Sequence, residues 1–214
     1  NLEVTIPALD AMHESICCFS YDGLEVYIDS DRAGGYGSFD LMVLRRPSTD
    51  ADWGPPENLG PGVNSSKDDC AACISADGLT LYFAANRAGG HGEYDIWVTT
   101  RATKDDSWQP AVNLGPTINT SADEANPWIS PNGLELYFGS YRSGGYGGQD
   151  IWLSTRTTTN AIWDPPVNLG PMVNTVYDEH RVSLSPDGLL LLFCDPSWTS
   201  RPRPGGYGGP DIWM

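Results

Sequence analysis

Short apolar runs alternate with turn signals along the whole chain, and no segment has sustained helical periodicity. One stretch illustrates the pattern: residues 125–130 are expected to form a strand ending in a Pro-Asn-Gly turn, and residues 134–138 a second, aromatic-rich strand. A glycine-dense loop over 142–150 follows, then a third strand over 151–156 and a short, proline-edged strand over 163–169. This order predicts a four-stranded antiparallel meander, the unit of a propeller blade.

The same pattern recurs four times at a spacing of 55 residues. The turn pair appears as Asp22-Gly23, Asp77-Gly78, Asn132-Gly133 and Asp187-Gly188. Each glycine loop begins with Arg and ends with Asp: Arg32 to Asp40, Arg87 to Asp95, Arg142 to Asp150 and Arg203 to Asp211. A Trp near Pro (Trp53, Trp108, Trp163) and an Asn-Leu-Gly-Pro follow in three copies. A period of this length indicates a solenoid, a propeller or an array.

The repeats predict one all-β domain over 1–214, a β-propeller of four four-stranded antiparallel blades. The modules cover about 14–64, 69–119, 124–174, and 179–214 together with 1–8. Residues 1–8 align with the fourth-strand segment 56–63, so the N-terminal strand is expected to complete the last blade and close the ring. A fragment of a five- or six-bladed propeller is the alternative.

Several motifs together resemble a known repeat family. They are Ser-Pro-Asp-Gly-Leu, Leu-Tyr-Phe, Arg-x-Gly-Gly-x-Gly-x-x-Asp-Ile-Trp and Asn-Thr-x-x-Asp-Glu, with the best copies at 130–152 and 185–213. These motifs resemble the WD40-like propeller repeat PD40, of the TolB-like type, and the resemblance covers essentially the whole chain. The resemblance implies a propeller of a bacterial periplasmic or exported protein. TolB-like propellers are usually six-bladed protein-binding modules, and this chain departs in blade count and repeat length.

Charge narrows the range of partners. The net charge is −16, with only two lysines, and such a surface repels phosphate backbones. No apolar run is long enough to span a bilayer, so no membrane insertion is expected. A protein, a peptide or a carbohydrate is the expected partner, and no nucleic acid.

The five cysteines are Cys17, Cys18, Cys70, Cys73 and Cys194. Cys70-x-x-Cys73 has metal or redox spacing, but neither a second pair nor a histidine pair completes a zinc site. Cys18 and Cys73 occupy the same position in neighbouring modules, and the sequence leaves a disulfide between them open.

Four acidic residues precede the innermost strands and form the candidate metal site: Glu14, Asp69, Glu124 and Glu179. Near the mouth of the central channel they could form a ring that recruits Ca²⁺, because crowded carboxylates favour a cation. The alternative, which the fourfold repetition favours, is that each carboxylate caps backbone N–H groups or pairs with an arginine. No other cofactor is expected.

Residues that break the repeat are the candidate ligand contacts. Trp128 lies on an innermost strand, and Trp198 lies in an insertion unique to the fourth module. The further candidates are Arg181, His180 and the loop residues Tyr36, His91, Tyr146 and Tyr207. We expect them around one loop face of the channel, because aromatic rings bind sugars or anchor peptide side chains and polar groups fix orientation.

These features favour a non-catalytic binding or interaction module of an exported bacterial protein. No Gly-x-Ser-x-Gly elbow is present, and no residue is assigned a catalytic role. Two alternatives remain: a carbohydrate-active glycosidase or lyase that uses channel carboxylates, and a structural spacer domain.

Overall fold

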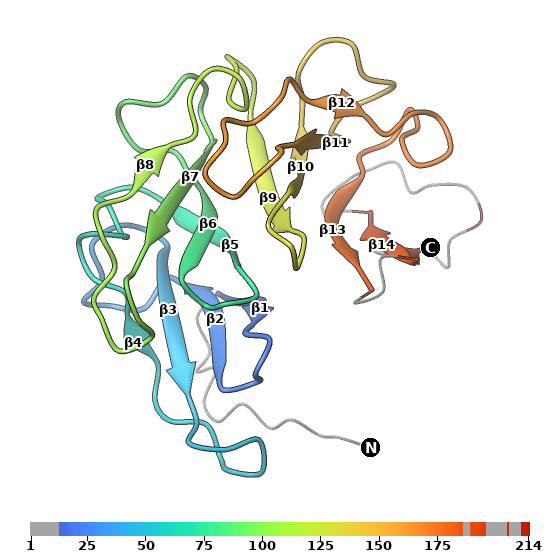
Figure 1. Cartoon of the computed structure of the whole chain (residues 1–214). Helices are drawn as coiled ribbons and strands as arrows, with labels where there is room; N and C mark the ends of the chain where they lie inside the picture. The colour runs from blue at the N-terminus through green and yellow to red at the C-terminus, as the bar shows by residue number, and fades with distance from the viewer. Residues whose placement is uncertain (1–12, 186–188, 196–204, 206–210) are drawn as a thin grey trace.

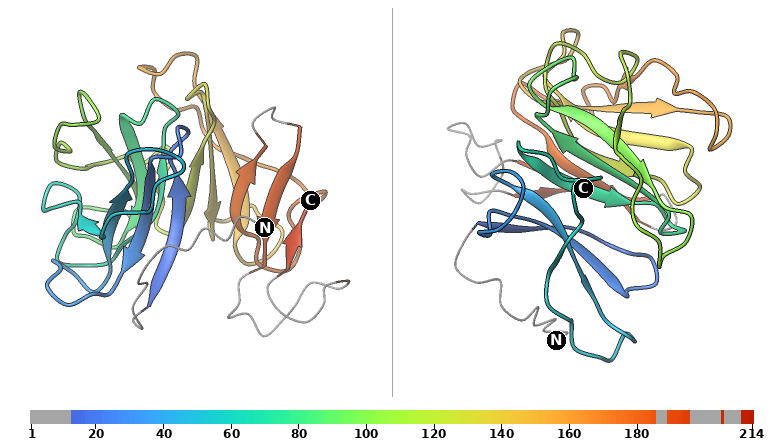
Figure 2. Two further views of the ribbon diagram at one scale, coloured as in Figure 1. Left: turned by 90° about the horizontal axis from the view of Figure 1, so that it is seen from below. Right: turned by 90° about the vertical axis from the view of Figure 1, so that its left-hand side faces the viewer.

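The computed structural model describes residues 13–185, 189–195, 205 and 211–214. Within these ranges the chain is all-β, and four antiparallel sheets are arranged as the four blades of a β-propeller (Figure 1). The blades follow one another around a centre in chain order (Figure 1 and Figure 2). The expected four-bladed all-β propeller is confirmed. The described residues contain no helix that could span a membrane.

Blades 1 and 2 are complete four-stranded meanders in which neighbours in sequence are neighbours in the sheet. Blade 1 comprises β1 (Glu14–Phe19), β2 (Glu25–Ser30), β3 (Asp40–Arg45) and β4 (Glu57–Asn58). Blade 2 comprises β5 (Asp69–Ile74), β6 (Thr80–Ala85), β7 (Asp95–Thr100) and β8 (Val112–Asn113).

Blade 3 repeats this plan, and blade 4 shows three strands in the described residues. Blade 3 comprises β9 (Glu124–Ile129), β10 (Glu135–Ser140), β11 (Asp150–Thr155) and β12 (Val167–Asn168). Blade 4 comprises β13 (His180–Leu184), β14 (Leu191–Cys194) and β15 (Ile212–Trp213).

The outermost strands are shorter than the sequence pattern predicts. The segment 163–169 was expected to form a strand, but only Val167–Asn168 pairs with β11. Pro165 and Pro166 precede this pair and have no N–H to donate to a neighbouring strand, so pairing begins only after them.

Each innermost strand contains a register shift that the sequence pattern did not reveal. The shift lies between Cys70 and Cys73 in β5, and the equivalent irregularity occurs in β1, β9 and β13. At this point Ala71, Asn126 and Arg181 adopt positive φ angles of 53°, 53° and 45°. Because a bulge breaks the alternation of a strand, consecutive residues reach the same side of the sheet.

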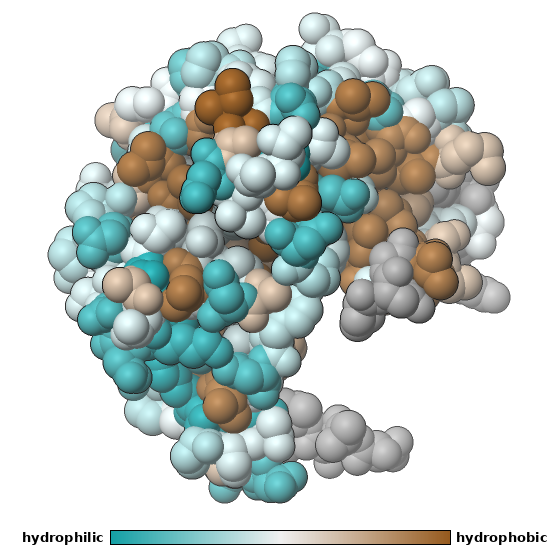
Figure 3. Space-filling model, in the orientation of Figure 1, coloured by the Kyte–Doolittle hydropathy of each residue, from teal (hydrophilic) through white to brown (hydrophobic). Residues whose placement is uncertain are grey.

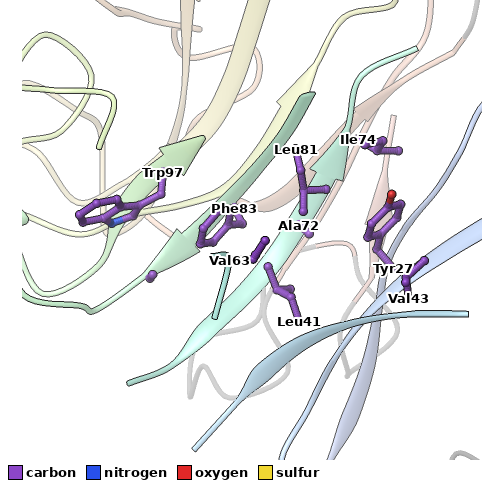
Figure 4. Packing of buried hydrophobic residues seen from close by; sticks show 10 residues of the cluster. Tyr27, Leu41, Val43, Val63, Ala72, Ile74, Leu81, Phe83 and Trp97 are labelled. Carbon is purple, nitrogen blue, oxygen red and sulfur yellow. The ribbon is translucent and has the colours of Figure 1, made fainter. Parts of the chain in front are cut away.

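The hydrophobic core lies between the blades. Figure 4 shows Tyr27, Leu41 and Val43 of blade 1 facing Leu81 and Phe83 of blade 2. Separate clusters of buried side chains join blade 2 to blade 3 and blade 3 to blade 4. Each blade is therefore stabilised by the apolar faces of its neighbours, as expected for a unit that cannot bury its own apolar face.

The seam between blades 4 and 1 differs from the other three. Ile212 is 78% exposed, whereas its equivalents Leu41 and Ile96 are fully buried. The outline of the molecule is open on this side in Figure 3. A hydrogen bond from Arg181 Nη2 to Ser15 Oγ over 3.1 Å crosses the seam. The closing strand expected at residues 1–8 lies outside the described residues.

Candidate functional site

The two ends of the propeller carry different segments. At one end, here called the loop end, lie the glycine loops between the second and third strands (31–39, 86–94, 141–149). At the other, the hairpin end, lie the tight turns that join the first and second strands (20–24, 75–79, 130–134). The antiparallel register places residues 124 and 140 at the loop end and residues 129 and 136 at the hairpin end.

A cavity of about 370 Å³ occupies the channel between the four innermost strands and extends to the hairpin end. Its lining combines aromatic, thiol and polar side chains: Phe19, Tyr21 and Trp128; Cys17, Cys18 and Cys73; Asn126, Arg181 and Ser183. Consecutive residues at or beside each of the four bulges line it, at 17–19, 71–74, 126–129 and 181–183. We call this feature the channel pocket.

Most residues that line the channel pocket differ from blade to blade, although Cys18 and Cys73 are equivalent. The three equivalent triplets read Ala-Ala-Cys at 71–73, Asn-Pro-Trp at 126–128 and Arg-Val-Ser at 181–183. The described lining contains no aspartate or glutamate. Its fixed charge is the guanidinium of the exposed Arg181. The pocket is therefore a mixed apolar and aromatic site with one cation, in a protein of strongly negative net charge.

Trp128 is half-buried in the pocket wall. Its ring meets that of Tyr137 edge to face, with ring centroids 5.7 Å apart and an interplanar angle of 68°. Tyr21 lies at the hairpin end of the same pocket and is 51% exposed, and burial of its ring raises the pKa of its hydroxyl. Sequence reasoning missed Tyr21. The available signal was that its equivalents are Ala76 and Pro131, so it also breaks the repeat.

His180 and Arg181 are adjacent in sequence but lie in different environments. His180 is buried, and its Nε2 lies 2.8 Å from the side-chain amide of Asn126. Burial, followed by the charge of Arg181, lowers the pKa of His180 to about 4. At neutral pH its imidazole is therefore uncharged and can accept the amide hydrogen of Asn126. His180 therefore contacts Asn126, a residue of the pocket lining, whereas Arg181 lines the pocket itself.

The loop residues Tyr36, His91 and Tyr146 lie at the opposite end from Trp128. Their side chains are exposed, and their backbone N–H groups each donate to the aspartate that ends the glycine loop, over 2.6 Å. The sequence analysis expected these residues and Trp128 around one face of the channel. The structure instead places them at opposite ends. Trp198 and Tyr207 lie outside the described residues.

The four candidate metal-binding carboxylates are buried at the loop end and bound internally. Asp69 accepts the Ser65 N–H over 2.5 Å and pairs with Arg87, and burial raises its pKa against the opposing effect of that arginine. Glu124 accepts the Ser140 hydroxyl over 2.7 Å and pairs with Arg142 over 3.2 Å.

The other two carboxylates follow the same plan. Glu14 accepts the Ser30 hydroxyl over 2.9 Å and pairs with Arg32. Glu179 accepts the Thr175 hydroxyl over 2.6 Å. Among the described residues, no group of three or more His, Cys, Asp or Glu side chains is arranged to hold a metal ion.

The repeated tryptophans and arginines also have internal partners. A guanidinium lies over each Trp ring near the outer strands, which places the charge on the negative face of the ring. The pairs are Arg46 with Trp53 at 4.4 Å, Arg101 with Trp108 at 4.5 Å and Arg156 with Trp163 at 4.2 Å. These tryptophans therefore belong to the packing of the blades.

Comparison with known proteins places the fold. No family model matches the chain, and no curated protein matches it. Among solved structures, TolB from Acinetobacter baumannii is similar at a TM-score of 0.56 and 15% identity, over 88% of this chain and 39% of that one. The TolB candidate of Agrobacterium tumefaciens is similar at a TM-score of 0.55 and 18% identity, over 83% of this chain and 52% of that one.

A thermostable family-43 glycoside hydrolase is also similar, at a TM-score of 0.52 and 15% identity, over 83% of this chain and 63% of that one. The chain thus spans less than two thirds of each of these proteins. At such identities the likeness concerns the fold alone. The chain has a TolB-like β-propeller fold.

Proposed function

We propose that this protein is a non-catalytic binding module of an exported bacterial protein, and that its channel pocket takes a peptide segment of a protein partner. The observation that carries this proposal is that the pocket is lined by side chains that break the repeat, with an aromatic wall and one cation. The TolB-like fold supports a protein partner, because the repeat family that the motifs resemble includes protein-binding propellers.

The chemistry of the lining indicates what the peptide would present. Trp128 and Tyr21 offer ring faces and edges to an apolar or aromatic side chain. Arg181 offers a guanidinium, which pairs most strongly with a carboxylate. We therefore expect an apolar residue close to an acidic side chain or a chain-terminal carboxylate.

The carbohydrate-active alternative has less support in this pocket. Glycoside hydrolysis generally uses two carboxyl groups on either side of the scissile bond. The described lining of the pocket has no carboxyl group, and the carboxylates at the loop end are engaged by arginine, serine and threonine. The spacer alternative predicts no ligand and is separated from our proposal by the experiment below.

The test is selection from a displayed library of random short peptides against the full chain, followed by calorimetry with the enriched peptides. We expect enriched peptides to combine an aromatic or aliphatic residue with a carboxylate. Trp128→Ala and Arg181→Ala should each weaken binding about tenfold or more, as anchors in the centre of an interface do.

Tyr146→Ala is the matched control, because it removes an exposed aromatic ring at the loop end. It should leave the dissociation constant unchanged. Enrichment that depends on Tyr146 and not on Trp128 would place the site at the loop end instead. Failure to enrich any peptide, or binding of oligosaccharides in the same assay, would contradict the proposal.

A further inference from the structure

Two cysteines on neighbouring blades lie side by side in the wall of the channel pocket. Cys18 on β1 is in register with Tyr27, and Cys73 on β5 is in register with Tyr82, so the two occupy the same place in their blades. Strands β1 and β5 pack against each other, and both cysteines line the pocket. Both thiols are free in this structure.

The sulfur atoms reach across the seam between the two blades. The Cys18 and Cys73 thiols lie close enough that each shifts the pKa of the other. Equivalent positions on two packed strands, both lining the same cavity, bring these two side chains near each other.

We propose that Cys18 and Cys73 are a modification site: they form a disulfide that joins blades 1 and 2 inside the channel pocket, by exchange with a low-molecular-weight disulfide such as oxidised glutathione. The Cys73 thiolate attacks one sulfur of the donor, whose S–S bond breaks and releases one thiolate. The Cys18 thiolate then attacks the Cys73 sulfur of the mixed disulfide and releases the second. The two cysteines are oxidised, the donor is reduced to two thiols, and these take up the two protons.

The environment favours Cys73 as the first nucleophile. Contact with the Cys18 thiol lowers the pKa of Cys73, whereas the same contact and burial raise the pKa of Cys18. The thiolate is the reactive form, so the lowered pKa directs the first attack to Cys73.

Another pair of thiols lies nearby and offers a matched control. Cys17 donates to Asp29 Oδ1 over 3.0 Å, and burial together with this carboxylate raises the pKa of both Cys17 and Cys70. These two cysteines are therefore held as thiols beside a carboxylate. We expect them to stay reduced under conditions that link Cys18 to Cys73.

The experiment oxidises the folded full chain with glutathione disulfide, blocks the remaining thiols and digests with trypsin. The disulfide would join the tryptic peptide 1–32 to the tryptic peptide 68–87. Each peptide contains two cysteines, because no Lys or Arg separates Cys17 from Cys18 or Cys70 from Cys73, so the mass of the linked peptide does not identify the bonded pair. The assignment therefore depends on variants. We expect the linked peptide in the wild type, in Cys17→Ser and in Cys70→Ser, and its loss in Cys18→Ser and in Cys73→Ser.

Thermal unfolding supplies a second readout. A disulfide that closes a loop of this length should raise the melting temperature by roughly 5–10 °C relative to the same protein in dithiothreitol. The rise should vanish in Cys18→Ser and Cys73→Ser and persist in the Cys17 and Cys70 variants. The inference is overturned if the folded wild type gives no linked peptide, or if the link survives in Cys18→Ser or Cys73→Ser.

Discussion

The loop end and the hairpin end of the propeller are built from the same repeat, yet they use it differently. At the loop end a buried carboxylate and an arginine pair in blades 1 to 3, as Glu124 does with Arg142. At the hairpin end of the channel the equivalent positions hold different side chains, and they surround a cavity. Residues that repeat between blades thus form hydrogen bonds and ion pairs within the protein, whereas many residues that differ between blades line the channel pocket.

The difference has a physical origin. Each glycine loop must satisfy the same backbone N–H groups, so each blade needs the same acceptor, such as Asp95 beneath His91 and Gly92. The channel pocket, by contrast, is a single space shared by four strands. A ligand there would meet four different environments, so selection for binding would act on each strand separately.

The largest loss of stability is expected from removing a buried carboxylate at the loop end. Glu124→Ala should lower the free energy of unfolding by about 3–5 kcal/mol, because it leaves the largely buried Arg142 without its carboxylate and the Ser140 hydroxyl without its acceptor. Urea denaturation followed by tryptophan fluorescence measures this. Tyr146→Ala at the same end should change stability by less than about 0.5 kcal/mol. A loss below about 1 kcal/mol for Glu124→Ala would refute the structural role of the carboxylate.

The next effect is a pH dependence centred on His180. Its pKa of about 4 in the folded state lies below its ordinary value of 6.5, so the unfolded chain binds a proton more readily. The stability that the neutral imidazole contributes is complete above pH 6.5 and is lost as the pH falls toward 4. Between pH 7 and pH 5 we expect a loss of about 2 kcal/mol from this group.

His180→Asn removes this titration, whereas His13 and His91 are present in both proteins. The difference between the two stability curves, measured by urea denaturation at each pH, therefore isolates His180. Parallel curves from pH 7 to pH 5 would show that the buried imidazole does not control the response.

Much of the fold was readable from the sequence, because the repeat reports the same local demands several times. The Asp-Gly turns, the glycine loops and the aromatic strands all predicted a blade. The site was less readable, because it depends on a bulge that places Asn126, Pro127 and Trp128 along one cavity. No glycine marks the positive φ at Asn126 or Arg181, and strand alternation alone would have placed neighbouring residues on opposite faces.

The smallest effect tests whether the channel pocket stores backbone strain. Arg181 has a φ of 45°, a conformation that costs an ordinary residue about 1–2 kcal/mol but is open to glycine. Arg181→Gly should therefore be more stable than Arg181→Ala by roughly 0.5–1 kcal/mol, since relief of strain exceeds the added flexibility of the unfolded chain. Both variants lack the guanidinium, so both should lose peptide binding about tenfold or more.

Ala71→Gly, at the equivalent position of blade 2, removes no charge and should gain a similar increment of stability without loss of binding. Urea denaturation and calorimetry on the same four proteins, wild type included, provide both readouts. If the glycine variants gain nothing, the positive φ angles carry no strain. If both glycine variants gain stability, and Arg181→Gly loses the peptide while Ala71→Gly keeps it, then the bulges store strain in both blades and the guanidinium of Arg181 is what the ligand contacts.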